Sequence, residues 1–157
     1  MIVIMTKKIE KVLSLISPDL QTLKDNYFVI GSCALILSGV PIEKISDLDL
    51  LVSNEDAEQL KLVWADRMRK KYAPSDQHLF RSNFGRFDFG ELDVEVMGEL
   101  EVFRNNEWKT LQIKDWIELS VGEYRIKIPT LEEQKQIFYF FGREKDKLKM
   151  KLIERYL

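Results

Sequence analysis

Apolar residues recur with the period of an α-helix near both ends of the chain. At the N-terminal end they lie three or four residues apart, which places their side chains on one helix face, and Pro18 predicts where this helix ends. At the C-terminal end, Thr130 and Glu133 form a capping-box pattern that predicts a helix to about residue 141. Gly142 then separates a strongly charged last helix over 143–157. The N-terminal stripe consists of Ile9, Val12, Leu13 and Ile16.

The segment between residues 27 and 71 alternates between strand and helix patterns. Residues 27–30 are aromatic and β-branched and are followed by Gly31, which predicts a strand, a tight turn and a short helix to about residue 38. A second strand is expected to carry Asp47 and Asp49. Ser53 has the side chain to cap a longer helix over about 55–71. The inner face of that helix is expected to contain Leu60, Val63, Trp64 and Met68.

Beyond residue 78 the hydrophobic period changes from that of a helix to that of a strand. Short strands are expected over 79–81, 85–89 and 92–97, the last of which alternates apolar and acidic residues. Hairpins follow over 99–113, turning at Asn105-Asn106, and over 116–128. Helices therefore flank a mixed β-sheet, and the fold class is α/β or α+β. With no repeat or low-complexity linker, residues 1–157 are expected to form one domain, with a core at about 20–128 and C-terminal helices at about 130–157.

Composition narrows the range of partners and compartments. The chain has 157 residues, is 45% hydrophobic and carries a net charge of −2, so no global charge favours nucleic acid or an anionic membrane. Its single cysteine excludes an intrachain disulfide and favours a reducing compartment. The apolar run at residues 1–5 is too short for the core of a signal peptide, and no run is long enough to span a bilayer. These features predict a soluble, cytoplasmic protein.

The candidate chemistry lies where a turn is followed by paired carboxylates. Asp47 and Asp49 are two residues apart, so a strand directs both side chains to one face. Gly31 allows a close approach of the backbone, and Ser32 is expected to cap the helix that follows. A helix N-terminus attracts phosphate, and carboxylates bind Mg²⁺. This combination is typical of nucleoside-triphosphate chemistry; the alternative for the two aspartates is a solvated strand end or turn.

A third carboxylate is available on the predicted strand over 92–97. Asp93 and Glu95 share one face of that strand, and either can complete the group if the strand lies beside the one with Asp47 and Asp49. Clustered carboxylates repel one another, and a divalent cation relieves this repulsion. Asp93 is our first choice and Glu95 remains open.

Taken together, these short motifs resemble those of the nucleotidyltransferase superfamily with the DNA polymerase β-like fold. The family pattern is Gly-Ser or Gly-Gly, a short helix, Asp-x-Asp, and a third Asp on a later strand. Within it, the chain more closely resembles the small bacterial branch that includes AbiEii-type toxins and antibiotic nucleotidyltransferases. The matching residues are Gly31-Ser32, Ala34-Leu35, Ser46-Asp47-Leu48-Asp49, Asp93, Lys135 and Arg143-Glu144-Lys145-Asp146.

The resemblance implies a reaction and a role for each of these positions. Asp47, Asp49 and Asp93 would be catalytic and bind Mg²⁺ or Mn²⁺, and Gly31-Ser32 would cradle the triphosphate. A nucleoside monophosphate would pass from an NTP such as ATP to an acceptor hydroxyl, with release of pyrophosphate. The acceptor would be a small molecule, a protein or a tRNA end. Lys135, Arg143 and Lys145 would neutralise phosphate charge or hold the acceptor.

Two alternatives to an active enzyme stay open at this stage. One is a binding or regulatory module of the same fold, working as half of a toxin–antitoxin pair with a partner protein. The other is a nucleotide-binding protein that has lost turnover. For the charged helix beginning at Arg143, the alternative to a substrate role is a solvated face with ion pairs between successive turns.

Overall fold

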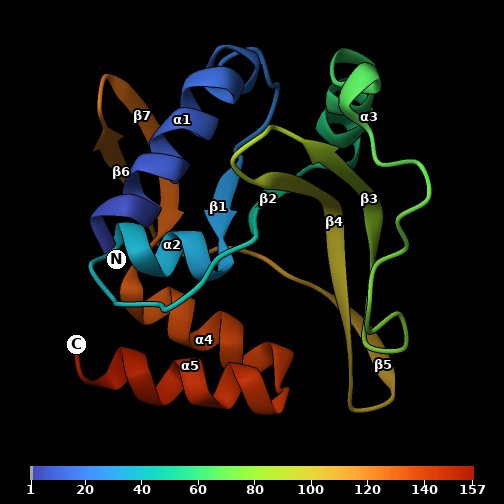
Figure 1. Cartoon of the computed structure of the whole chain (residues 1–157). Helices are drawn as coiled ribbons and strands as arrows, with labels where there is room; N and C mark the ends of the chain where they lie inside the picture. The colour runs from blue at the N-terminus through green and yellow to red at the C-terminus, as the bar shows by residue number, and fades with distance from the viewer. Residues whose placement is uncertain (1) are drawn as a thin grey trace.

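A mixed β-sheet lies at the centre of the molecule, with helices on both sides of it (Figure 1). This computed structural model describes residues 2–157, so the first residue of the apolar run at 1–5 lies outside the described residues. Strand β2 is antiparallel to β1 and parallel to β4, and β4 is antiparallel to both β3 and β5. The expected mixed α/β architecture is therefore confirmed. The strands are β1 (Phe28–Ile30), β2 (Asp47–Val52), β3 (Phe80–Asp88), β4 (Asp93–Arg104) and β5 (Glu107–Thr110).

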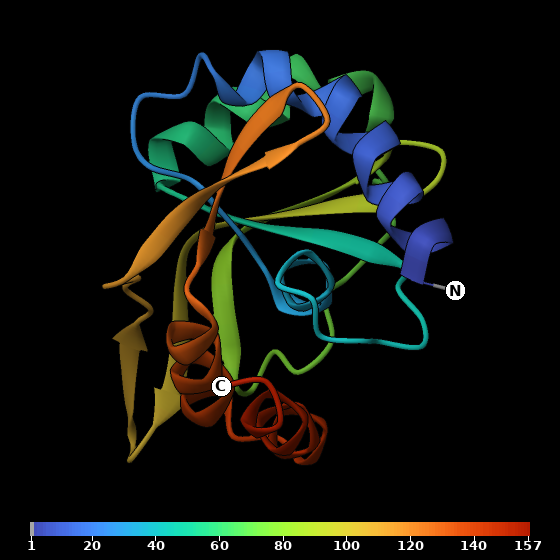
Figure 2. The same cartoon turned by 90° about the vertical axis from the view of Figure 1, so that its left-hand side faces the viewer.

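The two faces of the sheet are covered by different helices. Leu48 and Leu50 of β2 are fully buried in the core shared with α1 (Ile2–Leu20) and α3 (Asn54–Val63). Helices α4 (Leu131–Phe141) and α5 (Glu144–Glu154) pack in a second core, on the far side of the sheet from α1 and α3 (Figures 1 and 2). Because side chains alternate along a strand, the acidic positions of β2 face away from α1 and α3.

Strand register brings charged residues into rows across the sheet. The parallel pairing of β2 with β4 sets Asp47 beside Asp93 and Asp49 beside Glu95. The antiparallel pairing of β3 with β4 sets Arg86 beside Glu95. Residues paired in this way direct their side chains to the same face of the sheet. Asp49, Glu95 and Arg86 therefore form one row over three neighbouring strands.

Several of the predicted local elements are confirmed. Ser53 caps α3 by accepting a hydrogen bond from the Asp56 amide, and Thr130 caps α4 through the Glu133 amide. Asn105 and Asn106 both adopt positive φ in the turn between β4 and β5. The expected hairpin over 116–128 consists of β6 (Trp116–Val121) and β7 (Tyr124–Pro129), which form a separate small sheet. Local sequence thus determines these turns and caps.

The first helix does not stop before Pro18, as the sequence predicts, but runs to Leu20 with the proline inside it. A proline inside a helix has no N–H to donate to the carbonyl four residues before it, and its ring disturbs the preceding turn. After the proline, the Gln21 amide donates a helical hydrogen bond to the Ser17 carbonyl at 3.1 Å. Leu20 is buried and extends the apolar stripe that includes Ile16, so packing against the core sustains the last turn.

The third helix is shorter than expected. It ends at Val63, which is 48% exposed instead of buried, and a 3₁₀ turn, η1 (Ala65–Arg67), follows. The chain then leaves the helical path to pair with the edge of the sheet, where the Arg69 amide donates to the Arg86 carbonyl at 2.8 Å. The two short strands expected over 79–81 and 85–89 are one continuous strand, β3, since its whole length pairs with β4 across one register shift.

Among the described residues, no helix combines the length and the apolar character that a bilayer span requires.

Candidate active site

Three carboxylates converge on the sheet face turned away from α1 and α3. Asp47, Asp49 and Glu95 each offer one oxygen, and these oxygens all lie within 4.8 Å of one another. Asp47 and Asp49 come from β2, and Glu95 comes from the parallel neighbour β4 at the register position of Asp49. Such a set of hard oxygen donors matches the ligands that Mg²⁺ and Mn²⁺ accept.

Asp49 gives the strongest reason to expect a cation in this group. Its Oδ1 atom is buried and has no hydrogen-bond partner in the part of the chain that the structure describes. Burial, followed by the charges of Asp47 and Glu95, raises the pKa of Asp49 well above its usual value. A buried carboxylate without a partner is costly when ionised, and a bound cation would supply the missing interaction. The donor set therefore fits a divalent metal.

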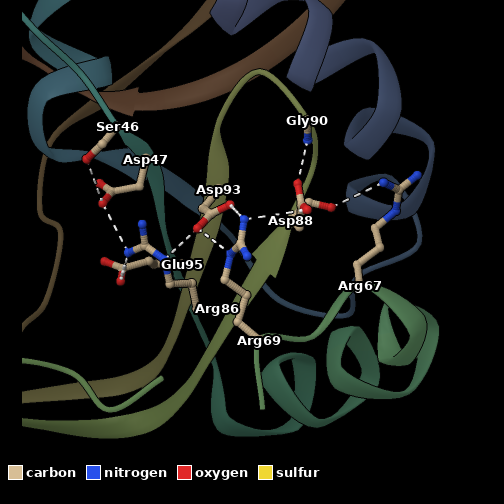
Figure 3. Close-up of polar contacts among 9 residues, drawn as sticks. All are labelled: Ser46, Asp47, Arg67, Arg69, Arg86, Asp88, Gly90, Asp93 and Glu95. Carbon is tan, nitrogen blue, oxygen red and sulfur yellow. Dashed lines mark hydrogen bonds and ion pairs between the residues drawn. The ribbon is translucent and has the colours of Figure 1, made fainter. Parts of the chain in front are cut away.

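Asp93 lies outside this three-carboxylate group. Arg69 Nε and Arg86 Nε both donate to Asp93 Oδ2 at 2.7 Å, and Arg69 Nη2 donates to Oδ1 at 3.0 Å (Figure 3). Partial burial by itself would raise the pKa of Asp93, but the hydrogen bonds from both arginines outweigh it, and the net pKa is lowered. Of the two residues that the sequence leaves open as the third carboxylate, the geometry favours Glu95.

Arg86 is a site residue that sequence reasoning missed. Its Nη1 atom donates to Glu95 Oε2 at 2.6 Å and to Asp47 Oδ2 at 3.2 Å (Figure 3). The guanidinium also lies over the Tyr72 ring, 4.6 Å from the ring centroid. The available signal was the alternation over 85–89, which places Arg86 on the face opposite the buried Phe87.

Gly31 lies directly against the carboxylate group. Its φ is +74°, and a Cβ atom at this position would come within 2.6 Å of Asp49 Oδ2. Glycine is therefore required here both for the backbone conformation and for the close approach. Gly31 is the first residue of α2 (Gly31–Leu37), and Ile30 occupies the N-cap position, with no side-chain cap bond in the described structure. The expectation that Ser32 caps this helix is wrong, because the helix begins one residue earlier.

A cavity of about 540 Å³ opens beside these residues, between the sheet and the C-terminal helices. Gly31, Ser32 and the three carboxylates line one part of it. Lys145 and Lys149 of α5 line another part, together with Arg143 at the start of that helix. A volume of this size is within the range of small-molecule sites, and the opposed charges suit a phosphate chain bound with a metal.

The basic residues expected at the site differ in whether they line the cavity and in which carboxylates they pair with. Lys135 lies apart from the residues that line the cavity, with its Nζ atom 3.4 Å from Glu154 Oε1. Arg143 faces the cavity, but its guanidinium is bonded to Asp146 at 2.7 Å and 3.0 Å and to Asp76 at 3.1 Å. Lys145 is exposed on the cavity wall. Lys149, which was not among the expected nucleotide ligands, is half-buried, and burial lowers its pKa.

Comparisons with known proteins agree on one fold. A provisionally named nucleotidyltransferase of Thermotoga maritima, TM1012, superposes with a TM-score of 0.74 at 26% identity, over 92% of both chains. The lincosamide antibiotic adenylyltransferase LnuA, bound to lincomycin, gives a TM-score of 0.57 at 14% identity, over 94% of this chain and 95% of the other. The antibiotic-resistance factor ANT(2'')-Ia gives 0.56 at 12%, over 98% and 84%. No family model and no curated protein sequence matches this chain.

Proposed function

We propose that this chain, which belongs by its fold to the nucleotidyltransferase superfamily, transfers a nucleoside monophosphate from an NTP to an acceptor hydroxyl and releases pyrophosphate. The observation that carries the proposal is the convergence of Asp47, Asp49 and Glu95 beside Gly31, with one buried oxygen of Asp49 unpartnered among residues 2–157. TM1012 and the antibiotic adenylyltransferases among the solved structures support a transferase of this class.

In this proposal each side of the cavity has its own task. Asp47, Asp49 and Glu95 would hold Mg²⁺ or Mn²⁺, and the bound metal would neutralise phosphate charge and activate the attacking hydroxyl. The backbone at Gly31 and Ser32 would lie against the phosphates, because no Cβ at residue 31 keeps them away. Lys145 and Lys149 would bind phosphate oxygens from the opposite wall. Asp93 would stay ionised and would hold the two arginines in place.

Labelled nucleotides test the proposal directly. The purified protein is incubated with each α-labelled NTP, Mg²⁺ or Mn²⁺, and a cell extract that supplies small-molecule, protein and tRNA acceptors. We expect label in one of these fractions, with matching pyrophosphate release that EDTA stops. Nucleotide binding without pyrophosphate release would indicate a binding module in place of an enzyme. No binding of any NTP with either metal would overturn the proposal.

The lysines of α5 provide a prediction about substrate binding. Lys145→Gln and Lys149→Gln should each raise the KM for the NTP about tenfold, because each removes one charge-assisted contact to phosphate. Lys135→Gln is the matched control, since Lys135 lies outside the cavity lining and pairs with Glu154 at the surface. Its KM should stay within about twofold of the wild-type value. Equal KM values in all three variants would show that Lys145 and Lys149 of α5 do not bind the nucleotide.

A further inference from the structure

Arg86 occupies the carboxylate group in the way that a cation would. Its Nη1 atom is bonded to two of the three candidate metal ligands, Glu95 at 2.6 Å and Asp47 at 3.2 Å. The Arg86 side chain is 13% exposed and that of Asp47 is 27% exposed, so this charge pairing is partly shielded from water. Arginine does not lose its proton in proteins, and therefore its positive charge is permanent. The group of candidate metal ligands thus contains an internal counter-ion.

A second set of contacts keeps the rest of this side chain in place. Arg86 Nε donates to Asp93 at 2.7 Å, and Arg69 binds the same carboxylate from the other side. The guanidinium carbon lies over the Tyr72 ring. The contacts to Asp93 involve neither Asp47 nor Glu95, so this part of the anchorage of Arg86 does not depend on the two candidate ligands.

The Arg86 guanidinium and a divalent metal require the same oxygens. A metal held by Asp47, Asp49 and Glu95 would need the oxygen lone pairs to which Nη1 donates, and two cations a few ångströms apart repel each other. Asp49 Oδ1, which Arg86 does not reach, is the atom left without a partner in the described structure. The arginine therefore satisfies part of the group and leaves the remainder for a metal.

We propose that Arg86 is an internal competitor of the metal: its guanidinium occupies Asp47 and Glu95 in the free protein and must release them before a divalent cation binds. This inference rests on the proposed function, because it concerns the same metal site. Arg86 is here a positioning residue, acting through Asp47 and Glu95. Its presence lowers the metal affinity of the free protein and holds the carboxylates in place until a metal replaces it.

Binding of Mn²⁺ alone, followed by electron paramagnetic resonance without nucleotide, tests this competition. Arg86→Met has a similar length, carries no charge and offers no oxygen ligand, so it should bind Mn²⁺ about tenfold more tightly than the wild type. Arg69→Met is the matched control, because Arg69 pairs with Asp93 and Asp88 and, within residues 2–157, with none of the three candidate ligands. Its affinity should change less than about threefold. Equal or weaker Mn²⁺ binding by Arg86→Met than by wild type would overturn the proposal.

A measurement on the wild-type protein keeps the test independent of how the variant folds. In an NMR titration with diamagnetic Mg²⁺, the Nε–Hε resonance of Arg86, assigned with Arg86→Lys, should shift more than that of Arg69. Saturation with Mg²⁺ without that difference would also contradict the competition.

The competition and the metal site can be refuted separately. If Asp49→Asn removes Mn²⁺ binding but Arg86→Met leaves it at the wild-type value, only the competition is wrong. If wild-type protein and Arg86→Met both bind no Mn²⁺, the metal site itself is wrong.

Discussion

Asp49→Asn is expected to reduce nucleotidyl transfer at least about a thousandfold, through kcat more than through the KM for the NTP. Asparagine has nearly the same shape as aspartate but carries no charge, so the proposed metal would lose a buried ligand while the packing against Gly31 stays. The measurement is pyrophosphate release with saturating NTP, Mg²⁺ and the acceptor fraction found by labelling.

Two further variants test which residue is the third carboxylate. Glu95→Gln should weaken Mn²⁺ binding as strongly as Asp49→Asn, because both side chains belong to the group whose oxygens lie within 4.8 Å of one another. Asp93→Asn should weaken it less, since Asp93 binds two arginines and lies outside that group. If Asp93→Asn abolishes Mn²⁺ binding while Glu95→Gln retains it, Asp93 is the ligand and the present assignment is reversed.

The same Asp49→Asn variant should be more stable than the wild type when no metal is present. Burial raises the pKa of Asp49, so the folded protein holds its proton to higher pH than the unfolded chain does. The stability that this group contributes is present below its unfolded pKa of about 3.9 and is lost as pH rises through the raised value. Asparagine does not titrate and avoids this loss.

Thermal unfolding in EDTA measures this effect and verifies that the inactive variant is folded. At neutral pH we expect the Tm of Asp49→Asn to exceed that of the wild type by roughly 2–4 °C, the shift that about 1 kcal/mol produces in a protein of this size. The difference should shrink as the pH falls toward the unfolded pKa of about 3.9, below which both states of the wild type bind the proton. A lower Tm for the variant at neutral pH would mean that Asp49 is satisfied without metal.

The second large effect concerns stability: Asp146→Ala should lower the free energy of unfolding by about 3–5 kcal/mol. The Asp146 side chain is fully buried and accepts hydrogen bonds from Arg143 Nε at 2.7 Å, Arg143 Nη2 at 3.0 Å and the Arg143 amide at 3.0 Å. Alanine would leave a half-buried guanidinium and a helix-terminal N–H without these partners. Because α5 carries Lys145 and Lys149, nucleotide binding should weaken as well.

Urea unfolding measures this loss, and Glu144→Ala is its control. Glu144 lies on the same turn of α5, but its side chain is 89% exposed and, in the described part of the chain, forms an ion pair with the exposed Lys147 alone. Its removal should change the free energy of unfolding by less than about 0.5 kcal/mol. Equal midpoints for the two variants would show that the buried carboxylate does not hold the start of α5.

Arg143 illustrates what a sequence motif alone leaves undecided. Its position in Arg143-Glu144-Lys145-Asp146 predicts contact with phosphate or acceptor, and the side chain does face the cavity. Its guanidinium is nevertheless engaged by Asp146 and Asp76, and Asp76 lies 67 residues away in sequence. The face that a helix presents to a site depends on how the helix packs. The sequence also leaves undecided which way Lys135 points; in the structure, α4 directs it to Glu154 on α5.

By itself, the sequence determined the features that depend on neighbouring residues. Period-two alternation placed Asp47 and Asp49 on one face of β2, and Ser53, Thr130 and the pair Asn105-Asn106 fixed two helix starts and a turn. These outcomes follow from steric and hydrogen-bonding preferences within a few residues. The mixed sheet with flanking helices followed from the same patterns.

Only the tertiary structure decided how these strands meet. The parallel register of β2 and β4 sets Glu95 beside Asp49, and β3 brings Arg86 into the same row. Register between strands far apart in sequence depends on the packing of the whole core, which no local pattern contains. The burial that leaves Asp49 Oδ1 without a partner in the described structure, which is the basis for the proposed cation, arises from that packing alone.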